Sequence, residues 1–88
     1  MIKNIKAGDY NLMLYHNIFT GVKILYYNTL IILETPAVFW ETSSIHEFEL
    51  KGERYNLETT VYWYGGCDYK ITHKLLGSND CLLFDVDL

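Results

Sequence analysis

Residues 55–75 read YNLETTVYWYGGCDYKITHKL, and their pattern decides the fold class. On each side of the Gly65-Gly66 pair, large apolar or aromatic side chains alternate with polar ones. Side chains that alternate with period two lie on opposite faces of a β-strand, and a glycine pair between two such runs is typical of a tight turn. The stretch therefore predicts an antiparallel hairpin with one face toward a core.

The register of this hairpin follows from its faces, because paired residues point to the same side of a sheet. The apolar faces match when Trp63 lies opposite Tyr69. The further pairs predicted by this register are Val61 with Ile71, Thr59 with His73, Glu58 with Lys74 and Tyr62 with Lys70. The last two are favourable cross-strand pairs, so the outer face supports the register that the apolar face sets.

A second turn at residues 77–80 leads into a last alternating run at residues 82–88. The pairs predicted there are Leu75 with Leu82, His73 with Phe84, Ile71 with Val86 and Lys70 with Asp87. In this arrangement Cys67 and Cys81 lie at opposite ends of one strand, about 30 Å apart at ~3.3 Å per residue. A disulfide needs Cα atoms within about 7 Å, so we expect two free thiols.

Upstream of this meander, the patterns are less uniform. His46, Phe48 and Leu50 fit a strand on the core face, although a capping box at residues 44–47 also allows a helix that ends at Gly52. Residues 22–27 and 30–35 predict a hairpin around Asn28-Thr29. Residues 9–21 fit either a strand or a helix, and residues 36–40 fit one short helical turn.

These readings together predict one domain over residues 1–88, because a chain of this length has no room for a second. Half of the residues are hydrophobic, which excludes a disordered chain. The predicted fold is mainly β: an antiparallel meander of six or seven strands that forms a small barrel or sandwich, with at most one short helix.

Catalytic and metal-binding patterns are missing from the sequence. It contains no phosphate-binding loop, dinucleotide-binding motif, nucleophile elbow or zinc-protease motif. The histidines and cysteines are scattered singly, and only His46 and His73 fall near one another, on either side of Thr59. A metal site needs three or four ligands, so we expect no bound metal. Because the catalytic and nucleotide-binding motifs are also missing, we expect no cofactor and no enzyme activity.

Charge and hydropathy restrict the partners. Seven Lys and Arg residues against eleven Asp and Glu residues give a net charge of −4, which disfavours direct binding of nucleic acid. No apolar run reaches the ~18 residues of a membrane span, and the N-terminus lacks the pattern of a secretion signal. We therefore expect a cytoplasmic protein that does not bind membranes.

A chain without catalytic motifs but rich in tyrosine is typical of a protein-binding module. On the predicted outer face, Tyr62 and Tyr64 would be anchors within an acidic rim of Glu58, Glu47 and Asp85, suited to a partner with a basic surface. The expected function is an inhibitor or modulator that acts by steric occlusion, of the kind that phages or mobile elements direct against defence nucleases. The alternatives are a β-barrel that binds a small molecule or nucleotide, and a structural subunit of a larger assembly.

The hairpin at residues 22–35 is apolar on both faces, and one small core covers both faces only with difficulty. Val22, Ile24 and Tyr26 share one face. The other face carries the residues that we expect to mediate self-association, namely Leu25, Tyr27, Leu30 and Ile32. The sequence thus predicts a homodimer, or a partner that covers this hairpin.

Overall fold

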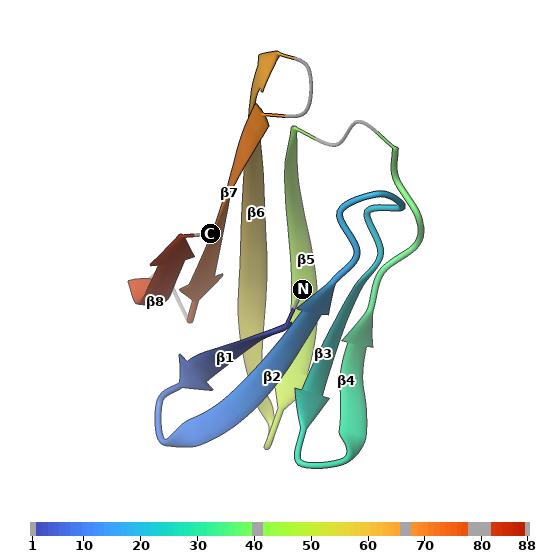
Figure 1. The fold of residues 1–88 in the computed structure, drawn as a ribbon. Helices are drawn as coiled ribbons and strands as arrows, with labels where there is room; N and C mark the ends of the chain where they lie inside the picture. The colour runs from blue at the N-terminus through green and yellow to red at the C-terminus, as the bar shows by residue number, and fades with distance from the viewer. Residues whose placement is uncertain (1, 40–41, 66–67, 78–81, 88) are drawn as a thin grey trace.

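A computed structural model describes residues 2–39, 42–65, 68–77 and 82–87, which form eight β-strands and no helix (Figure 1). The strands are β1 (Ile2–Ala7), β2 (Tyr10–His16), β3 (Lys23–Tyr27), β4 (Leu30–Glu34), β5 (Ser43–Leu50), β6 (Glu53–Gly65), β7 (Asp68–Leu76) and β8 (Leu82–Asp87). They form two antiparallel meanders, the N-terminal sheet β1–β4 and the C-terminal sheet β5–β8. The predicted mainly β, antiparallel class is confirmed.

Strand β1 is the element that the sequence reading missed. Its inward positions are Lys3, Ile5 and Ala7, while Ile2 points outward. A lysine at an inward position and an isoleucine at an outward one hide the period-two pattern. In β2 the inward residues Leu12, Leu14 and His16 follow period two, so residues 10–16 form a strand and not a helix.

The β5–β6 turn settles the choice between strand and helix for residues 44–51. Lys51 and Gly52 both have positive φ angles, 54° and 81°, which is the conformation of a two-residue hairpin turn. Strands β5 and β6 therefore pair directly around this turn, and the strand reading is confirmed. The hairpin at residues 22–35 is also present, with its turn at Asn28-Thr29.

The two sheets face each other and share one core (Figure 1). Its buried residues come from both sheets: Ile5, Ala7, Leu12, Leu14 and Leu25 from the N-terminal sheet, and Phe48, Leu50, Tyr55, Leu57 and Leu75 from the C-terminal sheet. At the sheet edges β1 lies beside β8, and β4 lies beside β5. Burial of these side chains between the sheets is the main stabilising contribution to the fold.

The register between β6 and β7 is the predicted one, with Trp63 opposite Tyr69 and Thr59 opposite His73. The predicted register between β7 and β8 is wrong by two residues, because Leu75 lies opposite Phe84. A shift of two residues leaves every side chain on its predicted face, so alternation alone cannot distinguish the two registers. A bulge between Leu75 and Leu76 sets the actual one, which pairs Asp85 with Lys74 and Asp87 with Thr72. The free-thiol prediction concerns Cys67 and Cys81, which lie outside the described residues.

The sheets differ in length, and this difference creates the candidate site. Strand β6 has 13 residues, whereas the strands of the N-terminal sheet have five to seven. At ~3.3 Å per residue step, β6 spans about 40 Å and β2 about 20 Å. The β6–β7 hairpin therefore extends past the N-terminal sheet at one end of the molecule (top of Figure 1).

Candidate protein-binding site

The projecting end of the β6–β7 hairpin is lined with aromatic side chains. Tyr62, Trp63, Tyr64 and Tyr69 have between 37% and 68% of their surface exposed. Trp63 and Tyr69 form a cross-strand pair on the inner side of the hairpin, with ring centroids 5.8 Å apart. Tyr62 precedes Trp63 in the strand and lies on the outer side, and Tyr64 lies where the register shifts between Trp63 and Gly65. Both sides of this hairpin end are therefore aromatic.

Trp63 and Tyr69 lie on the face that the sequence assigned to the core, yet both are exposed. The cause is the length of β6, because among the described residues the N-terminal sheet ends before it reaches this part of the hairpin (Figure 1). Sequence reasoning named Tyr62 and Tyr64 and missed this second pair. The available signal was the number of alternating residues in β6, compared with the much shorter strands upstream.

Two loops contribute further apolar surface at the same end (Figure 1). Phe19, in the β2–β3 loop, is 82% exposed, and Val38 and Phe39, between β4 and β5, are exposed as well. The backbone N–H of Val38 donates to the carbonyl oxygen of Thr20 at 2.8 Å, which joins the two loops. We call these three residues, together with Tyr62, Trp63, Tyr64 and Tyr69, the aromatic end.

Gly21 is required for the contact between the loops. Its φ angle is +79°, and a Cβ atom there would overlap the carbonyl oxygen of Val38. Asn17 supports the same turn, because its Oδ1 accepts hydrogen bonds from the backbone N–H groups of Phe19 and Thr20, at 3.0 and 3.2 Å. The exposed side chains of this loop are thus presented on an ordered backbone.

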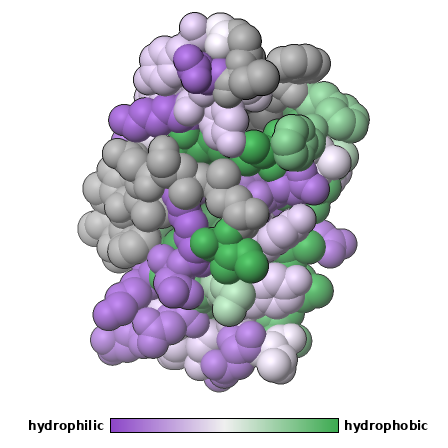
Figure 2. Space-filling view, in the orientation of Figure 1, coloured by the Kyte–Doolittle hydropathy of each residue, from purple (hydrophilic) through white to green (hydrophobic). Residues whose placement is uncertain are grey.

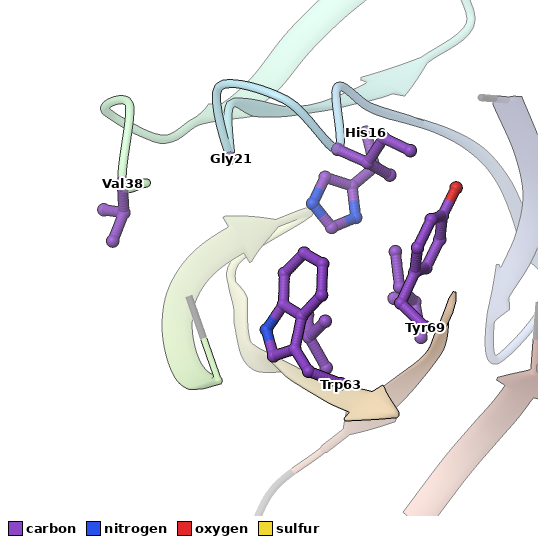
Figure 3. A pocket seen from close by; sticks show the side chains of 8 residues that line it. His16, Gly21, Val38, Trp63 and Tyr69 are labelled. Atoms are coloured by element: carbon purple, nitrogen blue, oxygen red, sulfur yellow. The ribbon is translucent and has the colours of Figure 1, made fainter. Parts of the chain in front are cut away.

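A small gap separates the loops from the hairpin, and His16, Trp63 and Tyr69 converge on it (Figure 3). Its full lining is His16, Ile18, Gly21, Val38, Val61, Trp63, Tyr69 and Ile71. The cavity has a volume of about 20 Å³, which is room for about one water molecule. This gap is too small for a metabolite or a nucleotide.

The acidic residues predicted around Tyr62 and Tyr64 lie farther along the sheet. Glu58 shares a cross-strand row with Lys74 and, by backbone register, Asp85. This row is four residues from Tyr62 along β6, or about 13 Å. Glu47 lies opposite Asn56, about 20 Å from Tyr62. Its carboxylate is 3.9 Å from the Arg54 guanidinium. Glu58 and Glu47 therefore do not form a rim around the two tyrosines.

The predicted self-association residues lie mostly inside the molecule. Leu25 is completely buried, and Tyr27 and Ile32 pack against the core, while Leu30 is exposed. The C-terminal sheet covers the face of β3 that carries Leu25, so this face is not available to a second molecule. The prediction selected the inner face of the hairpin, and the outward apolar face is the opposite one.

A polar layer crosses the interior behind the gap, and the sequence analysis did not predict it. Lys3, His16 and Lys23 come from the N-terminal sheet, and Ser44, Thr59 and His73 from the C-terminal sheet. Three hydrogen bonds join the sheets: Lys3 Nζ to His73 Nδ1 at 3.3 Å, His73 Nε2 to His16 Nδ1 at 3.0 Å, and Lys23 Nζ to Ser44 Oγ at 3.3 Å.

The protonation of His73 follows from its partners. An ammonium group only donates hydrogen bonds, so Nδ1 of His73 accepts from Lys3 and Nε2–H donates to His16. Burial, and to a lesser degree the nearby charges of Lys3, His16 and Lys23, lower the pKa of His73 to about 3. His73 is therefore neutral at physiological pH. The sequence placed His73 near His46, whereas the structure pairs it with His16.

Two further results limit the chemistry of this layer. The described residues contain no group of three or more side chains able to hold a metal ion. Thr59 is fully buried, and its Oγ1 has no hydrogen-bond partner among the described residues. Within the described residues, the layer thus contains two histidines in contact and no third metal-ligating side chain beside them.

Comparison with known proteins found no match among protein-family models, curated proteins or solved structures. In the described part of the chain, no helix is long and apolar enough to cross a membrane.

Proposed function

We propose that this protein binds another protein through its aromatic end. The observation that carries the proposal is the concentration of seven exposed apolar or aromatic side chains on one projecting hairpin and its two neighbouring loops. Tyrosine and tryptophan provide large, rigid contact areas at a low cost in conformational entropy, and they dominate the binding energy of protein interfaces. A projecting hairpin is also the shape that enters a cleft on a partner.

We infer that binding acts by occlusion, because the chain carries no catalytic motif and the gap behind the hairpin holds only about one water. A net charge of −4 favours a partner with a basic surface and accelerates association with it. With Glu58 and Glu47 at a distance from the aromatic end, their contribution is to long-range attraction rather than to the contact itself.

The class of protein that best suits this description is a small inhibitor or modulator, of the type that phages or mobile elements direct against defence nucleases. This part of the proposal rests on the small size, the acidity and the missing catalytic motifs. The size of the gap disfavours the alternative of a metabolite- or nucleotide-binding protein at this site.

The test is affinity capture from a host lysate, with the wild type, Tyr62→Ala/Tyr64→Ala and Glu49→Lys as parallel baits. Glu49 is exposed on β5, away from the aromatic end, and serves as the control. We expect one protein that the wild type and the control retain and the double variant loses. With that protein purified, the double variant should bind at least about 30-fold more weakly, equivalent to ~2 kcal/mol. Equal binding by all three baits would contradict the proposal.

A further inference from the structure

The outer face of the N-terminal sheet is unusually apolar for a surface in contact with water. Two mostly apolar rows of side chains cross its strands: Ile2, Tyr15, Ile24 and Glu34 in one row, and Asn4, Met13, Tyr26 and Ile31 in the other. Ile2, Met13 and Ile31 are 66%, 43% and 49% exposed. In Figure 2, hydrophobic residues lie near the middle of the view, with hydrophilic residues below and beside them.

The outer face of the C-terminal sheet provides the comparison. One row carries Ile45, Glu58 and Lys74, and the next carries Ser43, Thr60 and Thr72, so Ile45 is the single apolar residue of the two rows. A solvated face of an antiparallel sheet normally carries such polar residues, whereas an apolar face is normally covered. The two outer faces of one small protein thus differ in character, which points to a covering partner on the N-terminal sheet.

Two opposite charges at the corners of this face identify the partner. Lys6 lies on β1 at one corner, and Glu34 lies on β4 at the diagonally opposite corner; both are exposed. Four strands span about 14 Å, and the four residues from Ile2 to Lys6 span about 13 Å, so the face is nearly square. A two-fold axis along the other diagonal therefore places Lys6 of one copy on Glu34 of the second copy, twice.

The same rotation matches shape as well as charge. It carries Ile31 of one copy onto the region between Asn11 and Asn28 of the other. A hollow of about 210 Å³ lies there, lined by Asn4, Asn11, Leu12, Met13, Tyr26 and Asn28. An exposed isoleucine on one copy thus meets a recess on the other, and the contact is reciprocal, as a two-fold interface requires.

We infer that the protein forms a two-fold symmetric homodimer through the outer face of its N-terminal sheet. The interface is small beside the ~800 Å² per partner of a standard complex. We therefore expect a dissociation constant of about 1–100 μM for the dimer. This arrangement leaves the aromatic end of each copy accessible, and the inference does not depend on the proposed function.

Sedimentation velocity over a range of protein concentrations tests this dimer. We expect a monomer–dimer equilibrium for the wild type, at least tenfold weaker dimerisation for Lys6→Glu and for Glu34→Lys, and recovery in the Lys6→Glu/Glu34→Lys double variant. Glu49→Lys, which makes the same charge change on the other sheet, should dimerise like the wild type. Circular dichroism would confirm that each variant is folded.

Three outcomes would overturn the inference. The first is a wild type that remains monomeric at several hundred μM. The second is a dimer that persists unchanged when Ile31→Arg places a charge in the recess of the other copy. The third is a double charge swap that dimerises no better than the single variants, because this result would exclude the diagonal two-fold axis.

Discussion

Individual side chains in the polar layer fix how the two sheets are aligned. An apolar core resists separation of two sheets but opposes their sliding only weakly, because hydrophobic contacts are not directional. The three hydrogen bonds of the layer each run from one sheet to the other and have specific partners. We interpret this layer as a device for specificity of the fold, which costs desolvation of Lys3 and Lys23.

At this scale, the first prediction concerns pH. The pKa of His73 is about 3 in the folded protein, against 6.5 as its ordinary value, so the unfolded chain binds a proton first as the pH falls. The contribution to stability is complete above about pH 6.5 and decreases by up to ~1.4 kcal/mol per pH unit toward pH 3. Urea unfolding at pH 7.5, 6, 5 and 4 measures this slope.

The variant His73→Gln should flatten that slope, since glutamine does not titrate and can still accept from Lys3 and donate to His16. His46→Gln, which replaces a half-buried histidine outside the layer, is the matched control and should keep the wild-type slope. Identical slopes for His73→Gln and the wild type would show that His73 is not buried in its neutral form.

A second prediction concerns the two buried threonines. Thr59→Val should stabilise the protein by about 1 kcal/mol, because Thr59 Oγ1 is buried without a hydrogen-bond partner among the described residues. Thr35→Val is the control. Thr35 Oγ1 accepts a hydrogen bond from the backbone N–H of Lys23 at 3.0 Å. Loss of this hydrogen bond should destabilise the protein by ~1–2 kcal/mol. Equal destabilisation by both substitutions would contradict the assignment.

At the scale of elements, the sequence predicted the strand pairings that alternation of side chains determines. It did not predict features that alternation leaves open. The β6–β7 pairing was predictable because a glycine turn and both faces constrain it. The β7–β8 pairing was not, because a bulge shifts the register by two residues and leaves the faces unchanged. Strand β1 was missed because Lys3 occupies an inward position.

Only part of the candidate site was predictable from the sequence. Alternation identifies Tyr62 and Tyr64 as outward residues, but the exposure of Trp63 and Tyr69 depends on where the opposite sheet ends. The polar layer depends on how the two sheets are superposed, which no local pattern encodes. Lys3, His16 and Lys23 are brought together with His73 only by tertiary packing.

The third prediction separates binding from stability in the β6–β7 hairpin. Tyr62→Ala/Tyr64→Ala should change the free energy of unfolding by less than about 1 kcal/mol, since both side chains are exposed. Leu57→Ala, on the same strand within the core, should cost ~2–5 kcal/mol. A double tyrosine variant as unstable as Leu57→Ala would mean that these tyrosines stabilise the sheet rather than bind a partner.

At the scale of the whole molecule, two unequal sheets produce three different surfaces. The long hairpin leaves an aromatic end, the outer face of the C-terminal sheet is mostly polar, and the outer face of the N-terminal sheet is mostly apolar. The molecule is elongated, with extents of 41 × 25 × 18 Å, and the aromatic end lies at one tip (Figure 1). A dimer through the N-terminal sheet would present two such tips, which increases avidity for a partner with repeated sites.

Hydroxyl-radical footprinting of the protein alone and in complex with the captured partner tests the central claim most directly. The aromatic end contains four readily oxidised residues, namely Tyr62, Trp63, Tyr64 and Tyr69, all exposed in the free protein. We predict that binding protects these four residues and leaves the oxidation of Met13, on the outer face of the N-terminal sheet, unchanged. Protection confined to either outer face, with the aromatic end oxidised as in the free protein, would contradict the account.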